Sequence, residues 1–223
     1  MKKIKRLLLL VILAFAAYVS YIYFFTTDNS TDAINLVPKD AVYIIQTKKP
    51  IKAWKKFSSS DLWMHLKSYP EFTEIAESAN GLDQMIDGKK NLFSIFSLNN
   101  LIISAHVTRP TNYEFLFLPD LSKASKSDIV RNNLGKLFAL ADFKVSTQDY
   151  KGVEINICKD VSDNSTLYVS VIANYLACSY DLQILKNSIE EYYEPSFKKN
   201  GNYQFVEDEI ATDGLAQVYI NYA

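Results

Sequence analysis

The chain begins with a long apolar run that has charged residues on its N-terminal side only. Residues 7–25 contain no charged side chain, and they follow directly on Lys2, Lys3, Lys5 and Arg6. As a helix these nineteen residues rise about 28 Å, which is close to the hydrocarbon thickness of a bilayer. Basic residues at one end of such a segment stay in the cytoplasm. The pattern therefore predicts a cytoplasmic stub at 1–6 and a transmembrane signal-anchor at 7–25, with the rest of the chain outside the cytoplasm.

A cleaved signal peptide is the alternative interpretation of the same segment. Ala14-Phe15-Ala16 has the small-x-small form of a cleavage site. The apolar run, however, continues to Phe25, beyond the usual length of a signal-peptide core. The length favours a retained anchor, and the cleaved form stays open.

Beyond a polar tether at 26–36, the pattern predicts one domain over 37–223 with strands and helices. Apolar side chains of β-branched type or alternating spacing predict strands at 41–46, 101–107, 113–117, 143–147, 153–157, 167–171, 175–180 and 215–222. Helical spacing predicts a short helix after Ser60, several helical turns between 69 and 96, and longer helices around 130–141 and 182–192. The order of elements indicates an α+β fold, with one mostly antiparallel sheet and helices packed on one side. Because the last strand runs to the end of the sequence, we also consider that this is the N-terminal part of a longer protein.

The composition is that of a globular protein and disfavours two classes of partner. Hydrophobic residues make up 48% of the chain and charged residues 22%. Six glycines in 223 residues argue against a phosphate-binding loop. Without the four basic residues of the stub, 20 basic residues face 25 acidic ones. An acidic domain binds nucleic acid poorly, so no nucleic-acid partner is expected.

The two histidines, His65 and His106, lack the spacing of a metal site. A zinc site needs three or four ligands, and the chain has no H-E-x-x-H motif and no paired C-x-x-C motif. Ser104 and His106 share one face of a predicted strand, but about 7 Å of strand rise separates them. We expect this separation to prevent a direct hydrogen bond, so we predict no catalytic pair here.

The acidic clusters are predicted to be solvated surface. They are Glu190, Glu191 and Glu194 on the exposed side of a helix, and Glu207, Asp208 and Glu209 in a surface segment. Neither has the EF-hand pattern, and Asp160 to Asn164 is typical of a loop. The sequence therefore predicts no catalytic, cofactor-binding or metal-binding residue, and no cofactor.

The cysteines and tryptophans each leave two interpretations open. The predicted anchor would place Cys158 and Cys178 outside the cytoplasm, where disulfides form. In a simple meander one strand lies between them, and two inter-strand gaps amount to about 9.5 Å. We therefore favour two buried free thiols over a disulfide. Trp54 and Trp63 could line a ligand groove, but such residues more often close a core.

The chain contains several short motifs that occur together: Val37-Pro38-Lys39-Asp40-Ala41, Trp54, Ser60-Asp61-Leu62-Trp63 and Leu101 to His106. In these motifs the chain resembles an uncharacterised family of membrane-anchored envelope proteins from Gram-negative bacteria, a domain of unknown function. The resemblance covers most of 36–223 and implies a single-pass protein of the inner membrane with its domain in the periplasm. Members of that family are often longer. The resemblance implies no catalytic residue.

Our leading hypothesis is a non-enzymatic module that binds an envelope protein or envelope component. The alternative is an enzyme or small-ligand-binding domain whose site is assembled from residues distant in sequence. A deep pocket that gathers Ser104, His106 and acidic side chains would favour the alternative. A flat surface with an exposed apolar patch would favour the interaction module. An exposed apolar sheet edge at 215–222 would indicate a fold that further residues complete.

Overall fold

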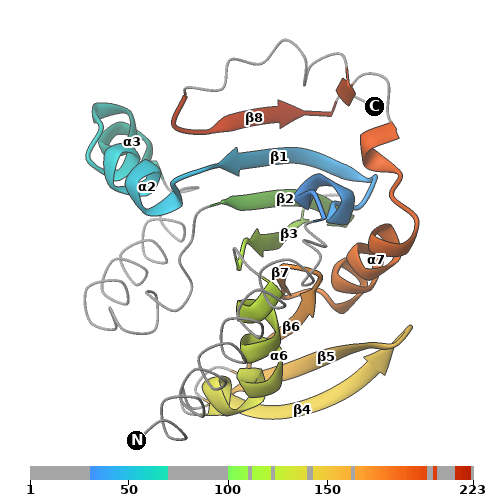
Figure 1. Cartoon of the computed structure of the whole chain (residues 1–223). Helices are drawn as coiled ribbons and strands as arrows, with labels where there is room; N and C mark the ends of the chain where they lie inside the picture. Colours follow the sequence, from blue (N-terminus) through green and yellow to red (C-terminus); the bar gives the residue numbers. More distant parts are fainter. Residues whose placement is uncertain are drawn as a thin grey trace, which may run out of the picture.

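One antiparallel sheet of eight strands organises the described part of the chain (Figure 1). The computed structural model describes residues 31–69, 100–109, 112–121, 124–139, 143–161, 164–199, 203–204 and 214–221. The strands are β1 (Ala41–Thr47), β2 (Leu101–Arg109), β3 (Asn112–Pro119), β4 (Phe143–Tyr150), β5 (Val153–Asp160), β6 (Thr166–Ile172), β7 (Tyr175–Ser179) and β8 (Gln217–Ile220). They pair in the order β4-β5-β6-β7-β3-β2-β1-β8. The predicted α+β class and antiparallel sheet are confirmed.

The described helices are η1 (Ala33–Leu36), α2 (Pro50–Ser58), α3 (Asp61–Leu66), α6 (Ala124–Ala139), α7 (Leu182–Tyr193) and η3 (Phe197–Lys199). Two of them, α3 and α7, begin directly after a residue whose side chain caps them. The Ser60 side chain accepts a hydrogen bond from the backbone N–H of Trp63, and the Asp181 side chain accepts from the backbone of Gln183 and Ile184. These caps satisfy backbone donors that a helix start leaves without partners.

The two hairpins of the β4 to β7 half turn between the predicted strands. Lys151 and Gly152 both have positive φ angles, 53° and 79°, as a tight two-residue hairpin requires. Ala173 has a φ of 50° in the second hairpin. Since these turns are local, they fix the pairing of β4 with β5 and of β6 with β7.

The long helices lie on opposite faces of the sheet. Val169 of β6 belongs to the apolar cluster that contains Val130 and Leu134 of α6. Ile172 of the same strand belongs to the larger cluster that contains Ile189 of α7. The prediction that helices pack on one side is therefore wrong. The physical reason is that β6 and β7 are buried on both faces, so each face needs a cover.

The end of the expected tether is part of the domain core. Residues Ala33, Ile34 and Leu36 of η1 are at most 4% exposed. The Ser188 hydroxyl of α7 donates a hydrogen bond of 2.7 Å to the carbonyl of Leu36. The core therefore starts at about residue 33, and not at 37 as the polar character of 26–36 suggested.

Other expectations fall beyond the described residues. The signal-anchor at 7–25 and most of the helical turns between 69 and 96 lie there, as does the start of the tether. In the described part, no helix has both the length and the apolar character needed to cross a bilayer. The anchor and the longer protein stay predictions.

Candidate functional site

Three side chains form a hydrogen-bonded relay that includes two residues of β2. Ser104 Oγ lies 2.9 Å from His106 Nε2, and His106 Nδ1 lies 3.1 Å from Asp40 Oδ1. An ionised carboxylate can only accept a hydrogen bond, so Nδ1 of His106 carries the proton that Asp40 accepts. Nε2 is then the acceptor for the Ser104 hydroxyl. The three groups thus have the order of a Ser-His-Asp triad.

The expectation that Ser104 and His106 cannot bond is wrong. The 7 Å rise separates backbone positions, but side chains on a strand lean along its direction, and the imidazole spans the remaining gap. Asp40 was not predicted as a hydrogen-bond partner of His106, because it lies 66 residues from His106 in the chain. It precedes β1, and the pairing of β1 with β2 brings it to the histidine.

The relay differs from a hydrolase triad in which of its members are buried. Ser104 is 0% exposed and His106 1%, whereas the Asp40 side chain is 55% exposed. A triad acts on a substrate that reaches the serine, and its acid is the buried member. Here the hydroxyl lies in the core and no substrate can reach it. The relay therefore supports the fold by satisfying polar groups inside the sheet.

Because of the relay, the free energy of unfolding should depend on pH in the acidic range. The hydrogen bond from His106 holds the pKa of the Asp40 carboxyl below its usual value near 3.8. Since the folded-state pKa is lowered, ionised Asp40 stabilises the fold above about pH 4, and this contribution is lost as the pH falls through the folded-state pKa. We expect Asp40→Asn to lower the unfolding free energy at neutral pH by at most about 1 kcal/mol, because the carboxyl is largely exposed. Urea unfolding of both forms across pH measures this. The difference should shrink below about pH 4, and a difference that stays constant would contradict the assignment.

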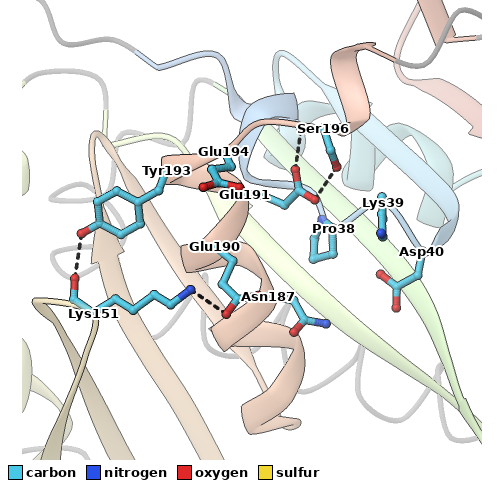
Figure 2. A pocket seen from close by; sticks show the side chains of 10 residues that line it. All are labelled: Pro38, Lys39, Asp40, Lys151, Asn187, Glu190, Glu191, Tyr193, Glu194 and Ser196. Atoms are coloured by element: carbon cyan, nitrogen blue, oxygen red, sulfur yellow. Dashed lines mark hydrogen bonds and ion pairs between the residues drawn. The ribbon is translucent and has the colours of Figure 1, made fainter.

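A cleft of about 720 Å³, lined mainly by charged and polar residue types, lies beside Asp40, against α7 (Figure 2). Its lining residues are Pro38, Lys39, Asp40, Lys151, Asn187, Glu190, Glu191, Tyr193, Glu194 and Ser196. Ser104 and His106 are absent from this lining. The cleft therefore does not bring the serine and histidine to a substrate.

Much of the cleft wall is made of groups already paired with each other. Glu190 accepts hydrogen bonds from Lys151 Nζ at 2.8 Å and from the Tyr150 hydroxyl at 2.7 Å. These bonds, that from Lys151 above all, lower the pKa of Glu190, and the same contact raises the pKa of Lys151. The Tyr193 hydroxyl donates to the carbonyl of Lys151. This network fastens the β4–β5 hairpin to α7.

The acidic cluster on α7 is only partly the solvated face that we expected. Glu191 is 9% exposed, and its carboxylate accepts bonds from the backbone N–H and the hydroxyl of Ser196, at 2.7 and 2.6 Å. It lies on the buried helix stripe with Ile184 and Ser188, at spacings of four and three residues. Glu191 thus closes the C-terminal end of α7, while Glu190 and Glu194 are exposed.

The other candidate residues of the sequence analysis have structural contacts or lie outside the described ranges. His65 is exposed and hydrogen-bonds Tyr69. The backbone N–H of Asp160, the last residue of β5, donates to the carbonyl of Ser165 across the loop between β5 and β6. Residues 207–209 lie outside the described ranges. Among described side chains, no three potential metal ligands converge.

Both cysteines are free thiols, as predicted. Cys158 is paired with Leu167 and Cys178 with Val169, so β6 lies between them. Cys158 is buried and Cys178 half-buried. Burial raises the pKa of the Cys158 thiol to about 11 and that of Cys178 to about 12. Thiols with such pKa values are poor nucleophiles at neutral pH.

One sheet face, over β3, β2, β1 and β8, carries exposed apolar side chains. The register places Tyr43 beside Ala105 and Ala105 beside Phe115, so these residues point to the same face. We call this surface the open face and define it by its exposed members, which are 37–58% exposed: Tyr43, Ile45, Val107, Tyr113, Phe115, Val218 and Ile220. The opposite face of the same strands is buried at Ile44, Ile102 and Leu116.

The open face continues the face that α6 covers. Phe117 of β3 pairs with Cys178 of β7, and Cys178 packs against the cluster beneath α6. Helix α6 thus covers this face of the sheet over β4, β5 and β6. The same face is exposed over β3, β2, β1 and β8. Sequence alternation marked Tyr113 and Phe115 as sharing a face, but only the position of α6 shows that this face is open.

Trp54 and Trp63 pack together in a small aromatic cluster. Their ring centroids lie 5.6 Å apart, and Phe57 lies 6.0 Å from Trp54 and 5.2 Å from Trp63. Trp63 is 7% exposed. The cluster joins α2 to α3 and belongs to neither of the two cores of the sheet.

The second half of the chain matches a known family model. Residues 123–223 match the model described as "Protein of unknown function (DUF3352)". This part of the chain runs from α6 to β8. The motifs that suggested a domain of unknown function, at 37–63 and 101–106, lie N-terminal to the match. The family description names no activity.

Other comparisons add little. No curated protein matched the chain. A solved structure, TP0453 in crystal form I, aligns at 8% sequence identity with a TM-score of 0.42. The alignment covers 86% of this chain and 64% of that one. The likeness is too weak to support a conclusion on fold or function.

Proposed function

We propose that this protein is a non-enzymatic interaction module of the cell envelope. In this proposal residues 7–25 hold it in the inner membrane, as a single-pass protein, with its domain in the periplasm. The open face is its binding surface for another envelope protein. The proposal rests above all on the exposed apolar side chains of that face.

The open face differs from an ordinary solvated sheet face. An antiparallel sheet that faces water normally carries polar residues on that side. Here the seven residues that define the open face are tyrosine, valine, isoleucine and phenylalanine, and all seven are exposed. Contiguous exposed apolar surface of this kind typically marks an interaction site.

An amphipathic helix is the partner element that fits best. The covered half of the same sheet face is packed against α6, whose Val130 and Leu134 supply the apolar stripe. The open half offers β-strand side chains of the same kind without a charged side chain among its exposed members. A helix laid on it would extend the layer that α6 begins, with its apolar side toward Tyr43 and Phe115.

The test uses a photo-crosslinking residue at Val107 in the full-length chain, expressed in its native cells. We expect a covalent adduct with one partner of defined mass, joined through a helical segment. Tyr43→Ser together with Phe115→Ser should remove the adduct, because the two substitutions delete the large side chains on both sides of Ala105. Urea unfolding should show the double variant still folded.

Position Val161 serves as the control site for the crosslinker. Val161 is 58% exposed but lies beyond β5, away from the open face. Equal adducts from Val107 and Val161 would refute a specific binding face. Adducts that join Val107 only to this chain itself, together with an unfolded double variant, would show that the face is internal core. The location is tested separately: an anchored chain stays in the membrane fraction at alkaline pH, and a C-terminal tag is digested only after the outer membrane is opened.

A further inference from the structure

The α2–α3 hairpin stands apart from the two cores of the sheet. Figure 1 shows α2 and α3 side by side beyond the end of β1. Their mutual contact is the cluster of Trp54, Phe57 and Trp63. The hairpin is thus a projecting unit with its own small core, attached to the sheet through β1.

The hairpin is strongly basic, whereas the rest of the domain is acidic. Residues 48–69 contain six lysines and one aspartate, a net charge of +5. The remainder of residues 31–223 contains 14 basic and 23 acidic residues, a net charge of −9. Such a local excess of charge creates a positive potential on one part of an otherwise negative molecule.

The lysines of α2 form one exposed stripe. Lys52, Lys55 and Lys56 have the three- and four-residue spacing that places side chains on one helix face, and all three are exposed. Lys48 and Lys49 are also exposed, just before the helix. The three ion pairs found between described residues involve none of these five lysines.

Exposed apolar side chains accompany the lysines. Leu62 is 59% exposed and Met64 51%, on either side of the buried Trp63, and Tyr69 is 45% exposed. A mixture of lysines and exposed apolar side chains suits the boundary between lipid headgroups and acyl chains. A nucleic-acid surface would instead call for aromatic rings free to stack, whereas Trp54 and Trp63 pack against each other.

We propose that the α2–α3 hairpin binds an anionic membrane surface. Lysine ammonium groups contact lipid phosphates, and an exposed apolar side chain of α3 enters the headgroup boundary. This membrane contact is a function additional to the proposed partner binding. It rests on the proposed anchor, which would hold the hairpin near the bilayer. Seven residues separate the expected end of the anchor at Phe25 from the buried Ala33, a reach of about 25 Å at full extension. The anchor would keep the domain that close to the bilayer.

The chain offers a local reporter, because its two tryptophans are Trp54 and Trp63. The full-length chain is reconstituted in vesicles of phosphatidylcholine, with or without phosphatidylglycerol, that carry brominated acyl chains. Bromine quenches only tryptophans that lie close to the acyl region. We expect quenching in the vesicles with phosphatidylglycerol, little in phosphatidylcholine alone, and a loss of quenching at high salt.

The decisive variant is Lys52→Gln with Lys55→Gln and Lys56→Gln. Three surface charges lost should weaken the membrane contact about a hundredfold, so quenching should disappear. The matched control is Lys136→Gln with Lys144→Gln and Lys159→Gln, which removes three exposed lysines on α6, β4 and β5. Its tryptophan fluorescence should be quenched as strongly as that of the wild type.

Two results would overturn the inference: equal quenching in both vesicle types, or no quenching in chains that float with the vesicles. Flotation itself tests the anchor. If the chain does not float with phosphatidylcholine vesicles, the anchor proposal is refuted. The hairpin inference then stands if phosphatidylglycerol brings the chain to the vesicles, and is overturned if it does not.

Discussion

Replacing Phe197 by alanine is expected to lower the free energy of unfolding by about 3–5 kcal/mol. Phe197 is 1% exposed. Its ring lies 5.2 Å from that of Tyr203 and 5.9 Å from that of Tyr219, centroid to centroid. Tyr219 belongs to β8, so this aromatic group holds the last strand of the sheet against the core. The substitution removes both the buried area and these ring contacts.

Urea unfolding measures the loss, and hydrogen exchange locates it. Amides of β8 that pair with β1 should exchange faster in Phe197→Ala, because the strand loses its side-chain support. The matched control is Phe115→Ala on the open face, where the ring is 44% exposed. It should cost about 1 kcal/mol or less. Equal losses from the two substitutions would mean that Phe115 is covered and that the open face is not open.

Replacing His106 by alanine is expected to destabilise the domain by about 2–4 kcal/mol. The imidazole is 1% exposed and holds both the Ser104 hydroxyl and the Asp40 carboxylate. Its removal leaves a cavity and deprives the buried hydroxyl of its partner. Ser104→Ala should cost less, about 1–3 kcal/mol, since only one hydrogen bond is lost and the ring still fills the core.

The other histidine provides the control. His65 is exposed, and His65→Ala should change the unfolding free energy by at most about 0.5 kcal/mol. A double variant, Ser104→Ala with His106→Ala, should cost less than the sum of the single variants, because the two groups bond to each other. Strict additivity would contradict the relay. Hydrolytic activity lost on Ser104→Ala with the fold intact would contradict its structural role.

Short-range patterns predicted much of the fold. Tyr168 to Val171 are apolar or small at every position, and Lys151-Gly152 is a turn that favours a tight hairpin, so β4 to β7 follow from neighbouring residues. Asp181 directly precedes the predicted helix at 182–192 and caps it, because a helix start needs an acceptor within three residues. The free thiols followed from the meander. In each of these cases the interacting groups lie close together in the chain.

The helix α2 shows where a local signal was passed over. Pro50 occupies its first turn, and the lysines and aromatic residues that follow recur at helical spacing. The first helix predicted in this region begins after Ser60, so no helix was predicted at 50–58. The error hid the lysine stripe, which becomes evident only once 50–58 is a helix.

The sequence by itself determined the kinds of elements, their approximate order and the α+β class, because side-chain periodicity is set by backbone geometry within one element. The tertiary structure alone decided which face α6 and α7 cover, since apolar residues on both sides of β6 do not say which helix goes where. It alone placed Asp40 against His106 and left the open face without a cover among the described elements. Those features depend on the pairing of β1 with β2 and of β3 with β7, contacts between residues about 60 positions apart whose registry no local pattern encodes.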